Sequence, residues 1–146
     1  MHTYVGYALL ATLAGALIPI MAGINGSLGQ TIGSTYYAAL VLLGVGFFAV
    51  LLVILFSSVP VPQQFEQSAP HQYIGGLIVA FYILSITFLV PRFGVGNSNF
   101  FVIVAQVISA AVIDHFGLLD AEIRLINLKR AIGITFLLAG IYIARK

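Results

Sequence analysis

The chain contains no cysteine, and only 7% of its 146 residues carry a charge. Without cysteine there is neither a disulfide framework nor a thiolate metal site. The three histidines, His2, His71 and His115, lie far apart in the sequence and form no ligand cluster. The sequence offers no nucleophile–base pair and no pair of carboxylates, so it predicts neither an enzymatic activity nor a cofactor.

The scarcity of charge decides the class of protein. Soluble domains are about 25% charged and 45–50% apolar, whereas this chain is 61% hydrophobic. Its ten charged side chains cannot cover the surface of a water-soluble fold, which predicts an integral membrane protein whose main environment is the lipid bilayer. The six basic residues lie near the ends of apolar stretches and form no patch that would follow a phosphate backbone, so nucleic-acid binding is not expected.

Five apolar stretches approach the roughly 20 residues that a membrane-spanning helix needs. They cover residues 4–24, 36–56, 73–90, 97–116 and 129–145. Pro19 is a candidate hinge in the first stretch, and Asn25-Gly26 is expected to end it, because this dipeptide favours a turn. The stretch from 57 to 72, which contains three prolines and Glu66, is expected to be an aqueous loop. The predicted fold is an all-α integral membrane protein, with residues 1–146 forming one domain of five transmembrane helices.

The distribution of positive charge gives little information about orientation. The six basic residues divide equally between the two sides of the membrane: Arg124, Lys129 and Arg130 on one, and Arg92, Arg145 and Lys146 on the other. An excess of Lys and Arg in cytoplasmic loops normally orients a membrane protein. A chain that inserts both ways can pair with its own inverted copy, as in the pseudo-two-fold architecture of secondary transporters. The chain is therefore predicted to be half of a ten-helix inverted-repeat transporter, working as an antiparallel homodimer on an unknown small molecule.

Polar side chains at membrane depth are the candidates for a substrate cavity. Gln106 lies at the middle of the fourth stretch, and Ser109 follows one turn later on the same face. Gln106 would offer one acceptor and two donors to a substrate, or it would form an interhelical hydrogen bond. Asn25, near the break at Pro19, either lines the site or caps a plain kink. Tyr82 either lines a cavity or packs against helices and lipid.

Three residues near span ends are further candidates. Asp114 and His115 are candidates for proton coupling, the alternative being a hydrated interfacial acid paired with a loop cation such as Arg124. Arg92, favoured at a helix C-terminus by the helix dipole, either snorkels to lipid phosphates or forms an anion-attracting vestibule. No metal site is expected.

Several stretches together resemble a known family. They are PIMAGINGSLG at residues 19–29, GG at 75–76, PRFG at 91–94, QVISAAVIDHFG at 106–117, RAIG at 130–133 and LAG at 138–140. Their order and spacing are similar to those of the short five-span branch of the drug/metabolite transporter superfamily, the YdcZ-like inner-membrane exporters of bacteria. The resemblance covers essentially the whole chain. It implies a location in the bacterial inner membrane and a ten-helix dimer, and it names no substrate.

Two departures limit what the resemblance implies about ligand contacts. Met21 stands where the family tends to have a glutamine, which removes a polar group from the expected cavity. The four-helix multidrug exporters of the same superfamily carry a carboxylate in the first span, and this first span has none, which disfavours proton-coupled efflux of bulky cations by that route. Two alternatives stay open: a heteromeric half-transporter that needs a paralogous partner, and a non-transporting membrane scaffold or regulatory subunit.

Overall fold

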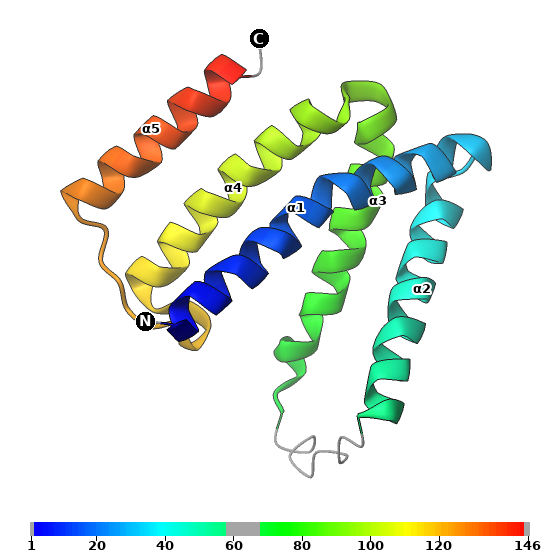
Figure 1. Ribbon diagram of the computed structural model, residues 1–146, viewed down its shortest axis with the longest axis horizontal. Helices are drawn as coiled ribbons and strands as arrows, with labels where there is room; N and C mark the ends of the chain where they lie inside the picture. Colours follow the sequence, from blue (N-terminus) through cyan, green and yellow to red (C-terminus); the bar gives the residue numbers. More distant parts are fainter. Residues whose placement is uncertain (1, 58–67, 145–146) are drawn as a thin grey trace. The chain divides into compact units, whose positions relative to one another are not determined.

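The structure is a computed structural model that describes residues 2–57 and 68–144, and most of the predicted aqueous loop lies outside these residues. The described residues form helices and contain no strand. In chain order the elements are α1 (His2–Thr31), α2 (Thr35–Phe56), the 3-10 turn η2 (Pro70–Ile74), α3 (Gly75–Phe93), α4 (Val95–Phe116), the 3-10 turn η3 (Leu118–Asp120) and α5 (Leu128–Ala144) (Figure 1). Four segments among the described residues are long and apolar enough to cross a membrane: Tyr4–Thr31, Thr35–Phe56, Pro70–Phe93 and Val95–Phe116.

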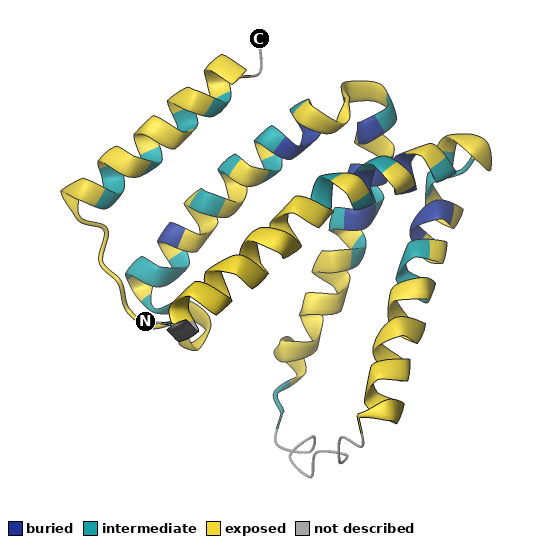
Figure 2. Ribbon diagram, viewed as in Figure 1, coloured by how far each residue is buried: buried dark blue, intermediate teal, exposed yellow. Residues whose placement is uncertain are grey.

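The chain divides into two compact units, residues 1–93 and residues 94–146, and each is described by itself. In the first unit, α1, α2 and α3 contact one another pairwise. The buried residues gather at one end of this unit, in the C-terminal half of α1, the first turns of α2 and the C-terminal half of α3 (Figure 2). These buried residues are Ala22, Asn25, Gly26, Ala38, Ala39, Ile83, Ile86, Thr87 and Val90.

Small residues allow α1 and α3 to approach closely at this end. A Cβ atom placed on Gly26 would lie 2.9 Å from Cγ1 of Val90 and 3.4 Å from Cδ of Pro91. At Gly29 the same construction meets Thr87 and Ala38 at ordinary contact distances of 3.4 and 3.6 Å. Lipid tails are as apolar as the side chains, so helix association in a membrane depends on close packing of this kind.

The expected end of the first helix at Asn25-Gly26 is wrong, because α1 continues to Thr31. The chain turns instead at Gly33, which has a positive φ of 70°. The amide of Gly33 donates to the carbonyl of Gln30, and the amide of Ser34 donates to the carbonyl of Gly29. This Schellman pattern satisfies the last carbonyls of the helix. The turn-forming tendency of Asn-Gly is overridden because both residues are buried against α3.

Local signals account for the other helix ends. The Ser34 side chain caps α2 by accepting a hydrogen bond from the Tyr37 amide at 3.4 Å. α3 runs past its expected end at residue 90 to Phe93, with Pro91 in its last turn, and Gly94 follows with a φ of 86°. α4 ends at Gly117, which adopts the left-handed conformation of a helix C-cap.

In the second unit, α4 contacts both η3 and α5. The segment between η3 and α5, residues 121–127, has no helix or strand. Ile123 folds over the end of α4, where a Cβ on Gly117 would lie 2.7 Å from Cγ1 of Ile123. α5 has no buried residue within the described part of the chain.

The close approach at Gly26 leads to a stability prediction. Gly26→Leu is expected to lower the free energy of unfolding by about 1–3 kcal/mol, the typical cost of overpacking, because the β-branched Val90 has little rotamer freedom. Thermal unfolding of the detergent-solubilised protein measures the change. Gly15→Leu is the matched control in the same helix, since nothing lies within 4 Å of a Cβ there. Equal melting temperatures for the two variants would contradict the packing described here.

Candidate functional site

A buried polar contact joins α1 to α3. The side-chain amide of Asn25 donates a hydrogen bond to Oγ1 of Thr87 at 2.5 Å, and that hydroxyl donates to the carbonyl of Ile83 at 2.7 Å. Asn25 is 2% exposed and Thr87 is 1% exposed. Asn25 thus makes an interhelical contact within its unit. The sequence does not single out Thr87 as a functional residue, because threonine is common in membrane helices and its hydroxyl usually bonds the backbone of its own helix.

An apolar groove lies beside this contact, between α1 and α2. It has a volume of about 310 Å³, and Asn25 is the polar member of its lining. Met21 is part of the wall, at the position where a glutamine would have placed a polar group. Pro19 lies inside the continuous helix α1 and is half-buried. Its role as a hinge stays a prediction.

Tyr82, in the middle of α3, is half-buried. Its hydroxyl oxygen is buried and has no hydrogen-bond partner among the described residues. A buried polar group without a partner costs about 1–3 kcal/mol. Such a hydroxyl is suited to receive a ligand, a water molecule or a group from a second copy.

Gln106 and Ser109 lie one turn apart on α4, and both are exposed. Gln106 stands at the centre of this 22-residue helix. Neither side chain has a hydrogen-bond partner among the described residues 94–144. The structure therefore gives these two side chains no structural hydrogen bond in their own unit, in contrast to Asn25.

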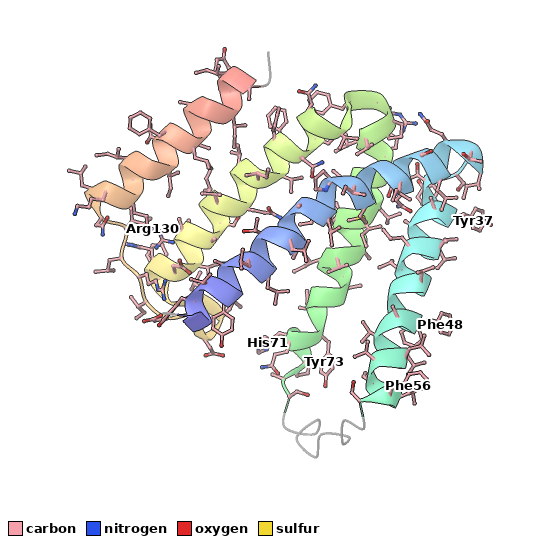
Figure 3. All side chains as sticks on the ribbon, in the orientation of Figure 1. Tyr37, Phe48, Phe56, His71, Tyr73 and Arg130 are labelled. Carbon is pink, nitrogen blue, oxygen red and sulfur yellow. The ribbon has the colours of Figure 1, made fainter. Side chains whose placement is uncertain are left out.

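Asp114 forms an ion pair with Arg130, whereas the alternative of a paired interfacial acid names Arg124 as an example of the cation. Nη2 of Arg130 lies 2.5 Å from Oδ2 of Asp114, and the two side chains are 29% and 31% exposed. Arg124 instead pairs with Glu122 at 2.7 Å in a well-exposed contact. The reason is local geometry: Glu122 is two residues away from Arg124, and Arg130 lies in the first turn of α5, which packs against α4 (Figure 3).

Backbone contacts extend this ion pair into a clasp around residues 121–127. The amide of Arg124 donates to the carbonyl of Asp114 at 2.8 Å, and Nη1 of Arg130 donates to the carbonyl of Arg124 at 2.9 Å. Nδ1 of His115 accepts from the amide of Ile126 at 3.1 Å. We call the side chains of Asp114, His115 and Arg130, which hold the backbone of Arg124 and Ile126, the α4–α5 clasp. The two residues that the sequence singles out for coupling thus both hold the connection between α4 and α5.

Arg92 lies at the C-terminal end of α3, where it turns back along its own helix. Nη1 donates to the carbonyl of Phe88 at 2.8 Å, and the guanidinium carbon lies 3.8 Å from the centre of the Phe88 ring. The Arg92 side chain forms part of the wall of a polar cleft of about 360 Å³ between the ends of α1, α2 and α3. The described residues contain no group of three or more potential metal ligands.

A double-mutant cycle tests the clasp. Asp114→Asn, Arg130→Gln and the double variant are expected to show a coupling energy of about 1 kcal/mol or more, because removing one partner leaves a half-buried charge unpaired. The matched cycle uses Glu122→Gln and Arg124→Gln, whose exposed pair should couple by less than about 0.5 kcal/mol. Unfolding of the solubilised protein measures both. Equal coupling in the two cycles would mean that the clasp adds nothing to an ordinary surface pair.

Comparison with known proteins places the chain in a family. The model of the family described as "Putative inner membrane exporter, YdcZ" matches residues 6–143. No curated protein and no solved structure matches the chain. The matched range covers nearly the whole sequence and agrees with the several helices of membrane-spanning length. The chain belongs to the YdcZ family of inner-membrane exporters and is a multi-pass protein of the inner membrane.

Proposed function

We propose that this protein exports a small molecule by alternating access, as an antiparallel homodimer of two five-span chains. Membership of an exporter family supports transport and gives no support to an enzymatic role. The observation that carries the proposal is the pair Gln106 and Ser109, exposed polar side chains near the middle of α4 that have no hydrogen-bond partner among the described residues of their own unit. Polar groups without partners are costly in hydrocarbon. A water-filled substrate cavity or a second copy of the chain would satisfy them.

The fifth span supports a dimer. α5 has 17 residues and no buried residue within the described range, and its length is about 25 Å by helical rise. This is short for a bilayer core of about 30 Å, and basic residues at both ends would snorkel to the interfaces. A helix with so little packing inside its own chain is well placed to hold a dimer together.

The antiparallel arrangement is supported by the equal division of the six basic residues between the two sides of a five-span topology. Two copies in opposite orientations would complete an inverted-repeat fold of ten helices, with residues 1–146 as one half. The candidate cavity residues are Gln106 and Ser109 in the second unit, and Asn25 and Tyr82 in the first unit. In this scheme Pro19 acts as the hinge, and Asp114 and His115 in the α4–α5 clasp are the candidates for coupling transport to a second ion.

A heteromer with an oppositely oriented paralogue would also complete a ten-helix fold and satisfy the polar side chains of α4. A non-transporting scaffold would leave Gln106 with a structural role only. Co-purification separates these possibilities. The heteromer requires a related partner, the scaffold requires an unrelated large partner, and the homodimer requires only a second copy of the chain.

Export is tested in liposomes. Purified protein in vesicles loaded with a broad metabolite mixture is expected to release particular compounds, which mass spectrometry identifies, while protein-free vesicles retain them. Gln106→Leu should slow this release by roughly fivefold or more, the equivalent of a lost hydrogen bond of about 1 kcal/mol. Thr12→Val is the matched control, because this exposed hydroxyl donates to the Ala8 carbonyl of its own helix. No release under any imposed gradient would contradict a transport function.

Orientation is tested in intact cells. The chain has no cysteine, so a single cysteine appended after Lys146 reports where the C-terminus lies. An impermeant thiol reagent is expected to label about half of the molecules from outside, because the basic residues favour neither orientation. Labelling of all or none would show one fixed orientation and rule out the antiparallel homodimer in favour of a partner chain.

A further inference from the structure

A polar cleft lies where the C-terminal end of α1, the start of α2 and the last turns of α3 meet. Its volume is about 360 Å³, and a neighbouring hollow of about 540 Å³ shares Gly33, Ser34, Thr35 and Arg92 with it. Both volumes are within the range of about 300–1,000 Å³ that is usual for small-molecule sites. Every residue of both linings belongs to the first unit.

Arg92 gives this cleft an uncompensated positive charge. It is the only Lys, Arg, Asp or Glu among residues 2–57 and 68–93, so no carboxylate in the described part of this unit neutralises it. His71 does not add to this charge, because it lies at the opposite end of the unit from Tyr37 (Figure 3). Tyr37 is in the first turn of α2, beside the cleft. An unpaired guanidinium in a polar hollow favours an anionic ligand.

The Arg92 side chain is held in place on the cleft wall. The Phe88 carbonyl occupies one N–H donor, and the Phe88 ring stacks under the guanidinium. A guanidinium has five N–H donors, so others are left for a ligand. Its planar fork matches the two oxygens of a carboxylate or a phosphate, and its position is fixed before the ligand arrives.

Neutral donors surround this charge. Oγ of Ser34 accepts from the Tyr37 amide and keeps its own proton for donation, and Thr35 adds a second hydroxyl to the cleft wall. Gln30 supplies a side-chain amide from the last turn of α1. The N-terminal end of α2 adds partial positive charge here, whereas the C-terminal ends of α1 and α3 add partial negative charge. The preference for an anion therefore comes from the full charge of Arg92 and the neutral donors around it, and not from the helix dipoles.

We propose that this cleft, formed by Gln30, Ser34, Thr35 and Arg92, binds the carboxylate or phosphate group of an anionic ligand. The identification of this anion as the exported substrate rests on the proposed transport function. The cleft lies at helix ends, so the same chemistry would also hold the phosphate of an anionic lipid headgroup. The experiment below separates these two sources.

Binding is measured with a single tryptophan. The chain has no tryptophan, and Tyr36 lines the neighbouring hollow while being 77% exposed, so Tyr36→Trp introduces a local fluorescent reporter. The full-length protein in phosphatidylcholine nanodiscs is titrated with succinate and with inorganic phosphate, at an ionic strength held constant with chloride. A saturable fluorescence change is expected for at least one of them. Arg92→Gln should weaken this binding at least tenfold.

Three further variants, each carrying the tryptophan reporter, make the test specific. Arg92→Lys keeps the charge without the fork and should bind more tightly than Arg92→Gln. Thr35→Val should weaken binding two- to fivefold, which gives a second measure if Arg92→Gln does not fold. Arg124→Gln, the same change in an exposed arginine of the second unit, should titrate like the parent. Parental affinity in Arg92→Gln, or equal losses in Arg92→Gln and Arg124→Gln, would overturn the proposal.

A lipid arm identifies the source of the anion. If a headgroup is the occupant, nanodiscs containing phosphatidylglycerol should change the fluorescence without any soluble anion, and Arg92→Gln should abolish that change. If neither soluble anion nor phosphatidylglycerol gives a response that depends on Arg92, the proposal is overturned. The outcome is independent of export: binding without release from liposomes would contradict transport alone, and release without binding dependent on Arg92 would contradict the anion site alone.

Discussion

The first unit depends on the close contact of α1 with α3. In a membrane no hydrophobic force brings helices together, because lipid and side chain are equally apolar. Gly26 lets the backbone of α1 approach Val90, and Asn25 and Thr87 then meet across the contact and satisfy each other. Gly26 permits the close approach and Asn25, the residue before it, forms the buried hydrogen bond, so neighbouring positions of α1 hold the two helices together. The cleft beside Arg92 lies next to this contact and shares Thr87 with it.

Much of the helical architecture could be predicted from apolar length alone. α2 is an uninterrupted run of 22 residues with a serine cap, so its bounds differ from the sequence prediction by a single residue. The end of α1 could not be predicted in this way, because Asn25-Gly26 favours a turn locally while the contact with Thr87 and Val90 keeps both residues helical. That contact joins positions about 60 residues apart, and no local pattern reports it.

The candidate site shows the same division. Asp114 stands out in the sequence because charges are rare, but its partner could not be chosen from the sequence. Arg124, Lys129 and Arg130 all lie nearby, and only the packing of α5 on α4 brings Arg130 to the carboxylate. Gln106 and Ser109 share a face of α4 as their spacing indicates. That both side chains are exposed on this face could not be read from the spacing, because exposure depends on which neighbours pack against α4.

The position of the polar cleft at one end of the first unit has a consequence for the direction of flux. In an antiparallel pair of identical chains, each copy would present its cleft to the opposite aqueous compartment. The ligand would then meet the same chemistry and the same affinity on entering and on leaving. Such a pair would have no built-in rectification: the direction of net movement would be set by the gradients of the anion and of any coupled ion, and a preference for export would come from the cell rather than from the fold.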